Sequence, residues 1–234
     1  LSFSDLLGAN FTNAKLSNIN FTGSNLSGVI FTGAYIENVS FSNSTIYGTK
    51  FVGTYLEKTI FDNSQINSAL FLGSKINDSS FNDVLIENTD FSGSIITDVD
   101  LSNQNFSNNL FQNTMLNSAN LSNSDFSNAD FSYAYLNSAN LSNSTFIDVN
   151  FFMTDFGSAN LSNANLVGAN LLKSYFKNTI LDEVLIDSTT LTDSCFENDI
   201  INKIQCTLMR YTLPGMPPYE TTYEKRDNYK INYP

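Results

Sequence analysis

Large apolar residues recur at every fifth position of the chain. Counting in fives from Leu1 to Ile201 meets forty-one residues, since (201 − 1)/5 + 1 = 41, and each of them is Phe, Leu or Ile. No insertion breaks this register. A strict repeat of this kind predicts a solenoid, because one repeat cannot bury its apolar face alone and stacks on its neighbours to form a continuous core.

The other four positions of the repeat indicate how each pentad is built. Two residues before the large apolar residue stands a small one, such as Ala9 or Ala119, so both positions are expected to face the core. The other three positions are mostly Asn, Ser, Thr, Asp or Gly and are expected to face water. The last of them holds residues that tolerate positive φ, such as Gly23 and Asn123. Each pentad is therefore predicted to be a very short extended piece followed by a corner.

The motif Ala-Asn-Leu-Ser-Asn stands at residues 119–123, 139–143 and 159–163. This A(D/N)LXX pattern, in which Phe freely replaces Leu, resembles that of the pentapeptide-repeat family over residues 1–205. The resemblance implies an all-β fold, a right-handed quadrilateral parallel β-helix with four pentads to a coil. It implies twenty residues per coil and about ten coils, from 200/20, which at about 4.8 Å per coil make a rod roughly 48 Å long.

A period of twenty residues separates the four predicted sides. Phe fills every twentieth position from 11 to 151 and, on the opposite side, from 21 to 81. Near residue 101 the pattern changes, because Leu101 replaces Phe on one side and Phe106 replaces Ile on the next. The volume of each coil is nearly kept, as expected if the sides share one close-packed core.

This exchange coincides with two polar residues at inward positions, Gln104 and Asn109. Inward amides must find hydrogen-bond partners or they destabilise the fold. We interpret them as a satisfied structural defect such as a bulge or bend, with a functional kink or ligand notch as the alternative. A third inward polar residue, Asp199, is interpreted as marking the closure of the last coil.

The sequence offers few residues for catalysis. It contains no His, and it lacks a glycine-rich phosphate loop, a Gly-x-Ser-x-Gly elbow and a Cys pair at metal spacing. We therefore predict that the protein is not an enzyme and has no catalytic residues, cofactor or metal. No apolar run approaches the length of about 20 residues that a membrane helix needs, so no membrane insertion is predicted.

One acidic group could bind calcium. It comprises Asp78, Asp83, Glu87, Asp90, Asp98 and Asp100. Asp78 and Asp98 are twenty residues apart and are expected to stack about 4.8 Å from each other on one corner. We interpret the group as a solvated acidic patch, because no backbone loop is expected to wrap it.

Two cysteines, Cys195 and Cys206, lie at the end of the repeat, and Cys206 takes the next position of the apolar column. A disulfide between them could tie down the last coil in an oxidising compartment. Their predicted sides are not adjacent, so an unpaired, buried Cys206 with an exposed Cys195 is an equal alternative. Cysteine usage does not fix the compartment.

Many Asn-x-Ser/Thr sequons lie on outward positions and are candidate N-glycosylation sites. They include Asn10, Asn20, Asn25, Asn38, Asn43, Asn105, Asn120, Asn140 and Asn160. The repeat itself generates them, so they are weak support for secretion. We expect an extracellular or cell-surface location, with a cytoplasmic one as the alternative.

One outward column of the repeat stands out. Every twentieth residue gives Lys15, Tyr35, Tyr55, Lys75, Ile95, Met115, Tyr135, Asp155, Tyr175 and Cys195. Aromatic packing across neighbouring strands is one explanation. A contact surface is the other, because contiguous exposed apolar patches usually mark partners. A second, patchier group is predicted on the neighbouring side: Ile30, Leu70, Leu72, Leu110, Phe152 and Leu172.

The repeat pattern fails after Ile201, and residues 206–234 are predicted to form an extended tail rich in Tyr and Pro. Residues 1–200 hold 20 acids and 6 bases, a net charge of −14, whereas residues 201–234 hold 3 acids and 5 bases, a net charge of +2. Tyr211, Tyr219 and Tyr223 of this tail are therefore candidate contacts with the acidic rod of the same molecule or of a neighbour. The chain starts in register at Leu1 without Met or an evident cap, which suggests a processed or trimmed N-terminus and an open solenoid end.

These features favour a non-enzymatic structural solenoid that associates with itself into a fibre or layered assembly, through its ends, the tyrosine column and the tail. The resemblance implies one alternative, since some pentapeptide-repeat proteins mimic DNA and bind DNA gyrase, protecting it from quinolones. B-DNA carries a charge every ~1.7 Å, so ~48 Å of mimic would need roughly 28 negative charges. The rod has 20 acids, which argues against this alternative. The other alternative is a monomeric adaptor or effector that binds another protein. No binding of nucleic acid is expected.

Overall fold

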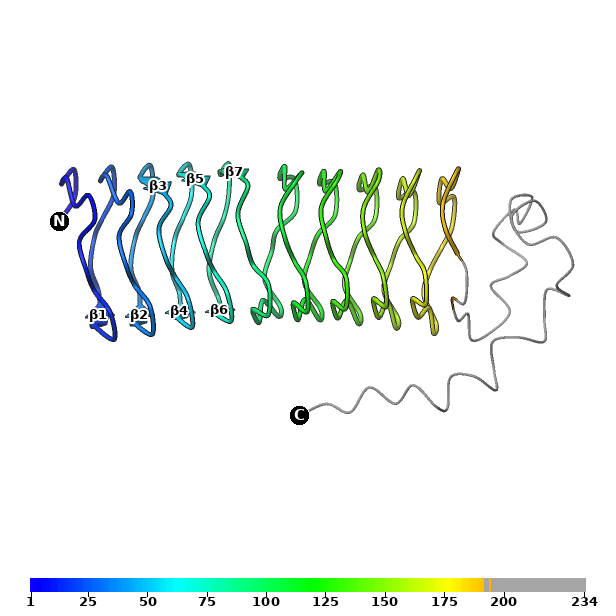
Figure 1. Ribbon diagram of the computed structural model, residues 1–234, viewed down its shortest axis with the longest axis horizontal. Helices are drawn as coiled ribbons and strands as arrows, with labels where there is room; N and C mark the ends of the chain where they lie inside the picture. Colours follow the sequence, from blue (N-terminus) through cyan, green and yellow to red (C-terminus); the bar gives the residue numbers. More distant parts are fainter. Residues whose placement is uncertain (192–193, 195–234) are drawn as a thin grey trace, which may run out of the picture.

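The computed structural model describes residues 1–191 and residue 194, which wind into an elongated solenoid (Figure 1). Its strands are β1 (Lys15–Ser17), β2 (Tyr35–Glu37), β3 (Thr45–Tyr47), β4 (Tyr55–Glu57), β5 (Gln65–Asn67), β6 (Lys75–Asn77) and β7 (Leu85–Glu87). The sheet β1-β2-β4-β6 runs along one edge of the rod and the sheet β3-β5-β7 along the opposite edge. The described residues contain no helix, so the prediction of an all-β fold is confirmed.

Every pairing in the solenoid is parallel and joins residues twenty positions apart. Within the sheets Tyr35 pairs with Tyr55, and beyond β7 the columns continue as single-residue bridges as far as Asn170 with Thr190. The predicted coil of twenty residues is therefore confirmed. The continuously described residues make nine and a half coils, from 191/20, so the tenth predicted coil lies only partly within them.

Each corner is made by one residue in the left-handed backbone conformation. All positions in steps of five from Phe3 to Ser188 have positive φ. Most of them are Gly or Asn, the residue types that tolerate this conformation. The next backbone N–H closes many of these turns, as where the N–H of Ala9 donates to the carbonyl of Leu6 at 2.9 Å. The predicted division of each pentad into a short extended piece and a corner is thus confirmed.

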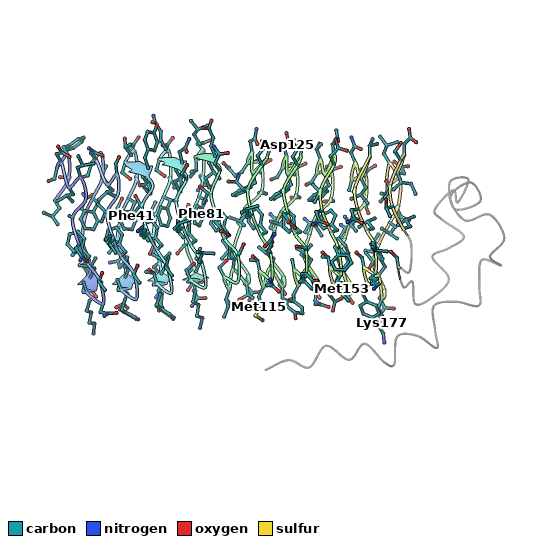
Figure 2. All side chains as sticks on the ribbon, in the orientation of Figure 1. Phe41, Phe81, Met115, Asp125, Met153 and Lys177 are labelled. Atoms are coloured by element: carbon teal, nitrogen blue, oxygen red, sulfur yellow. The ribbon has the colours of Figure 1, made fainter. Side chains whose placement is uncertain are left out.

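The large apolar column fills the inside of the rod. Phe51 stacks on Phe31 and Phe71 with ring centroids 5.1 and 4.6 Å away, and it meets Phe41 edge to face at 5.8 Å across the core. Figure 2 shows Phe41 and Phe81 inside the rod. Leu1 is an exception at 59% exposed, since no described coil lies beneath it. Many inward hydroxyls are also paired, as where the Thr49 hydroxyl donates to the carbonyl of Leu26 at 2.7 Å, whereas those of Ser64 and Ser74 are buried without a partner.

The backbone hydrogen-bond ladder between coils is interrupted once within residues 1–191. No bridge joins Ser80 to Asp100 or Leu85 to Asn105, although bridges join the corresponding pairs in the coils before and after. None of the seven inter-coil bonds that the pattern requires between residues 78–88 and residues 97–107 is formed. We call this interface the seam. Figure 1 shows the coils drawn apart there, after β7.

At the seam the N–H of Asp78 makes no bond to the carbonyl of Thr97, and the expected stacking of Asp78 on Asp98 stays a prediction. The two inward amides lie beside the seam and are hydrogen-bonded, as a satisfied defect requires; the alternative of a functional kink stays a prediction. Asn109 is fully buried, and its side-chain oxygen accepts the backbone N–H of Thr89 at 2.6 Å across the edge of the seam. The side-chain amide of Gln104 donates to the carbonyl of Ser102 at 3.2 Å.

Candidate interaction surface

Four outward columns define the four sides of the rod. The leucine side carries Asn10, Ile30, Lys50, Leu70, Asp90, Leu110, Asp130, Asn150, Asn170 and Thr190; the tyrosine side carries the predicted column from Lys15 to Tyr175. The asparagine side carries Asn20, Ser40, Ile60, Ser80, Asp100, Asn120, Asn140, Asn160 and Ile180. The aspartate side carries Asp5, Asn25, Thr45, Gln65, Leu85, Asn105, Asp125, Thr145, Asn165 and Leu185. They follow one another in this order around the coil.

The tyrosine side opens with a stack of four side chains. The rings of Tyr35 and Tyr55 are parallel within 6°, with centroids 5.0 Å apart. The ammonium of Lys15 lies 5.8 Å from the Tyr35 ring, and that of Lys75 lies 5.3 Å from the Tyr55 ring. Each ring is thus placed between an aromatic and a cationic neighbour, an arrangement that stabilises both.

Hydrogen bonds and charge hold the two phenols in their protonated form. The pKa of Tyr35 is raised because partial burial disfavours the phenolate, and the charges of Glu37 and Glu57 add to this. The pKa of Tyr55 is raised first by its hydrogen bond to Glu57 at 3.0 Å and then by partial burial. The amide of Asn77 donates to the same phenol oxygen at 3.2 Å.

The structure brings the predicted tyrosine column together over nine coils. Parallel bridges join Lys75 to Ile95, Ile95 to Met115 and so on to Tyr175. Figure 2 shows Met115 projecting from this edge of the rod. The apolar members of the column are only half-buried, and Tyr35 and Tyr55 use their ring faces for stacking, as the structural explanation predicted. The stacking leaves ring edges and hydroxyls, rather than open ring faces, at the surface.

The predicted second group lies on the leucine side, with Leu110 the most exposed member at 39%. Phe152 packs edge to face against Tyr133, with centroids 5.3 Å apart. Sequence reasoning missed Tyr133, which occupies a corner with φ 60 and is 45% exposed. It could have been found as a bulky residue at a position normally held by Gly or Asn.

Charge is unevenly distributed among the four sides. We assign to each side its outward column and the two residues after each core residue. The six lysines of the described chain, Lys15, Lys50, Lys58, Lys75, Lys173 and Lys177, all lie on the tyrosine and leucine sides. Seven acids accompany them: Glu37, Glu57, Asp78, Asp90, Asp98, Asp130 and Asp155.

The other two adjacent sides carry no base within residues 1–191. Their ten acids are Asp5, Asp62, Asp83, Glu87, Asp100, Asp125, Asp148, Asp182, Glu183 and Asp187. The tyrosine and leucine sides therefore have a formal net charge of 6 − 7 = −1, and the asparagine and aspartate sides one of −10. The period of twenty would have revealed this division from the sequence alone.

Asparagine amides form ladders along the outside of the rod. The side-chain N–H of Asn140 donates to the side-chain oxygen of Asn120 at 3.2 Å, and Asn120 donates in the same way to Asp100 at 3.0 Å. In this ladder each amide donates toward the N-terminal end, and the first member is an acceptor, Asp100. The amide nitrogens of the sequons at Asn120 and Asn140 are thus engaged in hydrogen bonds. The side chains of Asn10 and Asn105 are exposed.

Asp130 heads a second such ladder on the leucine side. Burial opposes its ionisation, but donors from Gln112, Ser132 and Asn150 outweigh burial and lower the pKa of this carboxyl. Gln112 and the backbone of Ser132 donate at 2.6 and 2.8 Å, and Asn150 donates at 3.1 Å. Because the folded pKa lies below the unfolded value of about 3.9, the carboxylate stabilises the fold above that pH and loses this effect as the pH falls through the folded pKa.

Asp130→Asn is therefore expected to lower the free energy of unfolding by about 1 kcal/mol at neutral pH. The value is low for a charged hydrogen-bonded group because the site is only half-buried. The difference from the unchanged protein should shrink as the pH falls below about 4. Urea unfolding at a series of pH values measures both. Asp98→Asn, at an exposed corner, is the control, and an equal loss at all pH values would contradict the role of the carboxylate.

The acidic residues do not gather into a metal site in the described part of the chain. No three His, Cys, Asp or Glu side chains come close enough there to hold a metal ion together. The seam also separates Asp78 and Asp83 from the next coil, which carries Asp98 and Asp100. Among residues 1–191 and 194, no helix has the length and apolarity to cross a membrane.

Several predicted residues lie outside the described residues. They are Cys195, Asp199, Cys206, Tyr211, Tyr219 and Tyr223. The disulfide, the closure of the last coil and the contacts of the tail therefore stay predictions, as does the domain boundary at residue 205.

A comparison with curated protein sequences found no significant match. Among solved structures, the chain is similar to HetL, a pentapeptide repeat protein involved in heterocyst differentiation regulation from the cyanobacterium Nostoc sp. strain PCC 7120. Identity is 19%, 81% of this chain and 87% of that chain are covered, and the TM-score is 0.47. Trypsin-treated QnrB1, a plasmid-mediated fluoroquinolone resistance protein, is similar at 14% identity, with 92% and 100% covered and a TM-score of 0.46.

A pentapeptide repeat protein from the Arabidopsis thaliana thylakoid lumen is similar at 20% identity, with 44% of this chain and 71% of that chain covered and a TM-score of 0.42. All three TM-scores lie below 0.5, so no function is inferred from these structures. A sequence model described as pentapeptide repeats matches residues 4–43, 86–123, 124–162 and 159–198 in 8 copies. These matches span more than half of the 234 residues. The chain belongs to the pentapeptide repeat family.

Proposed function

We propose that this protein is a non-enzymatic solenoid that associates with further copies of itself through its tyrosine and leucine sides. The observation that carries the proposal is the division of charge, with all six lysines of the described chain on these two adjacent sides. The remaining sides carry ten acids and no base within residues 1–191. A rod of this kind has one near-neutral half of its surface and one acidic half.

Electrostatics then select which surfaces of two rods meet. Contact between acidic sides would place carboxylates against carboxylates, and such repulsion acts over about 10 Å at 0.1 M salt. Contact between the near-neutral sides avoids this repulsion and brings Lys75 and Lys177 within reach of acids such as Asp155. The tyrosines and Met115 on the same sides are residue types enriched at protein interfaces.

The test is the association state of the full chain by sedimentation velocity. Lys75→Glu changes the charge of the tyrosine side by −2 and is expected to lower the association constant at least tenfold. The matched control pairs Asn20→Asp with Gln65→Glu, which adds the same charge to the two acidic sides with nearly isosteric side chains. An equal loss in both variants would show that net charge, not this surface, governs association.

In the alternative function as a monomeric adaptor, the protein would use the same surface to bind a different protein. If the unchanged chain stays monomeric at all concentrations, self-association is wrong. Substituting Tyr35, Tyr55, Tyr135 and Tyr175 by Ser should then abolish recovery of a specific partner protein without changing particle size.

The charge distribution does not favour the alternative of a DNA mimic. A rod of this length would need roughly 28 negative charges to match B-DNA, whereas residues 1–191 carry 17 acids and 6 lysines. A gyrase supercoiling assay with added protein tests this alternative, and neither inhibition nor protection is expected.

An extracellular or cell-surface location remains part of the proposal. Enzymatic removal of N-linked glycans from the native-source protein should then lower its apparent mass. An unchanged mass together with recovery from the cytoplasm would contradict it.

A further inference from the structure

The seam divides the rod into two blocks. The blocks contact each other on two sides of the rod and not on the other two. The backbone N–H groups of residues 78, 81, 83, 86, 88, 100 and 105 would bridge two coils here in the regular pattern and do not. Side chains on both rims are uncovered, with Leu85 at 56% the most exposed large apolar residue beyond the first coil. Glu87 and Asn105 are exposed too, whereas outward residues of most interior coils are half-buried.

The two opposite sides stay closed at the same level of the rod. On the leucine side Phe91 donates its N–H to the carbonyl of Leu110 at 2.8 Å, and its ring stacks on Phe111 with centroids 5.1 Å apart. On the tyrosine side Ile96 donates its N–H to the carbonyl of Met115 at 2.8 Å. The rod is therefore continuous along two sides and interrupted along the other two.

Unlike core residues meet on both open sides of the seam. Phe81 would stack on Leu101, and Ile86 on Phe106, whereas Phe91 meets Phe111 on a closed side. Elsewhere each ring has a like neighbour, since Phe81 stacks on Phe61 at 4.8 Å and Phe106 stacks on Phe126 at 5.2 Å. Unlike pairs do not break the ladder by themselves, because Phe146 lies next to Leu166 and its N–H still donates to the carbonyl of Asn165 at 2.7 Å.

We propose that the seam is a hinge built into the solenoid. The blocks on either side, residues 1–96 and 101–191, tilt about the closed leucine and tyrosine sides. Tilting opens and closes the asparagine and aspartate sides. An opening movement breaks no backbone hydrogen bond between the two open rims, because none is formed there. Carboxylates on both rims, including Asp83 and Asp100, favour the open position. The inference does not depend on the proposed self-association.

Spin-label distances in the full chain test the movement directly. Both cysteines are first changed to Ser, and label pairs are placed on the aspartate side four coils apart, about 19 Å along the axis. The pair at Thr45 and Asp125 spans the seam, and the pair at Asn105 and Leu185 does not. The spanning pair is expected to give a longer mean distance and a broader distribution. Equal, narrow distributions for both pairs would overturn the hinge.

Discussion

Phe71→Asp is expected to unfold the central coils of the rod. Phe71 is fully buried and stacks on Phe51 and Phe91, with ring centroids 4.6 and 4.9 Å away. Removing a buried Phe side chain typically lowers the free energy of unfolding by about 3–5 kcal/mol. An unpaired buried carboxylate adds to this loss. Because each coil contacts only its neighbours, the damage should spread to the adjacent coils.

Circular dichroism and thermal unfolding measure the effect. The control is Leu72→Asp, one residue further on, where the side chain faces outward and is half-buried. This change should leave the spectrum unaltered. A soluble Phe71→Asp protein with the spectrum of the unchanged chain would mean that the column does not form the core.

Ala139→Leu is the second substitution with a large expected effect. Ala139 is 1% exposed and lies two residues before Leu141, with Ala119 and Ala159 at the same position of the neighbouring coils. Additional methylene groups in a close-packed core typically lower the free energy of unfolding by about 1–3 kcal/mol. Urea unfolding should show this loss, because Ala139 is 1% exposed and a Leu side chain would add volume to a close-packed core.

Ser142→Leu is the matched control, since Ser142 faces outward on the same coil. It should change stability by less than about 0.5 kcal/mol. Equal stability of the Ala139→Leu protein and the unchanged chain would contradict the inward orientation of this position.

The sequence was sufficient to predict the coil of twenty residues and its four sides. The reason is that a single apolar column in strict register leaves one way to bury Phe31, Phe51 and their equivalents. The corners followed from residue type, because Gly and Asn tolerate positive φ where most residues do not. The tyrosine column was also predictable, since residues twenty apart must stack.

The seam could not be predicted from volume alone. Exchanging Phe for Leu at position 101 and Ile for Phe at position 106 nearly conserves the volume of a coil. Residue type does not predict the loss of the ladder either, because the ladder is intact where Phe146 meets Leu166 and Phe151 meets Leu171. The sequence therefore located the defect, through Gln104 and Asn109, but did not predict a loss of inter-coil hydrogen bonds.

The use made of the tyrosine column was also beyond sequence reasoning. A column of aromatic residues predicts stacking or a contact surface equally well. Only the geometry shows Lys15 and Lys75 closing the two ends of the Tyr35–Tyr55 stack. The charge division among the sides was within reach of the sequence, because it follows from the period of twenty.

Electron microscopy of negatively stained, native-source protein tests the central claim most directly. The full chain is compared with a chain that lacks residues 207–234. We predict that the full chain forms assemblies of rods. If these assemblies are lost on truncation, the tail bridges the subunits. Isolated rods about 5 nm long in both samples, on the coil spacing above, would contradict self-association and leave the adaptor function as the better explanation.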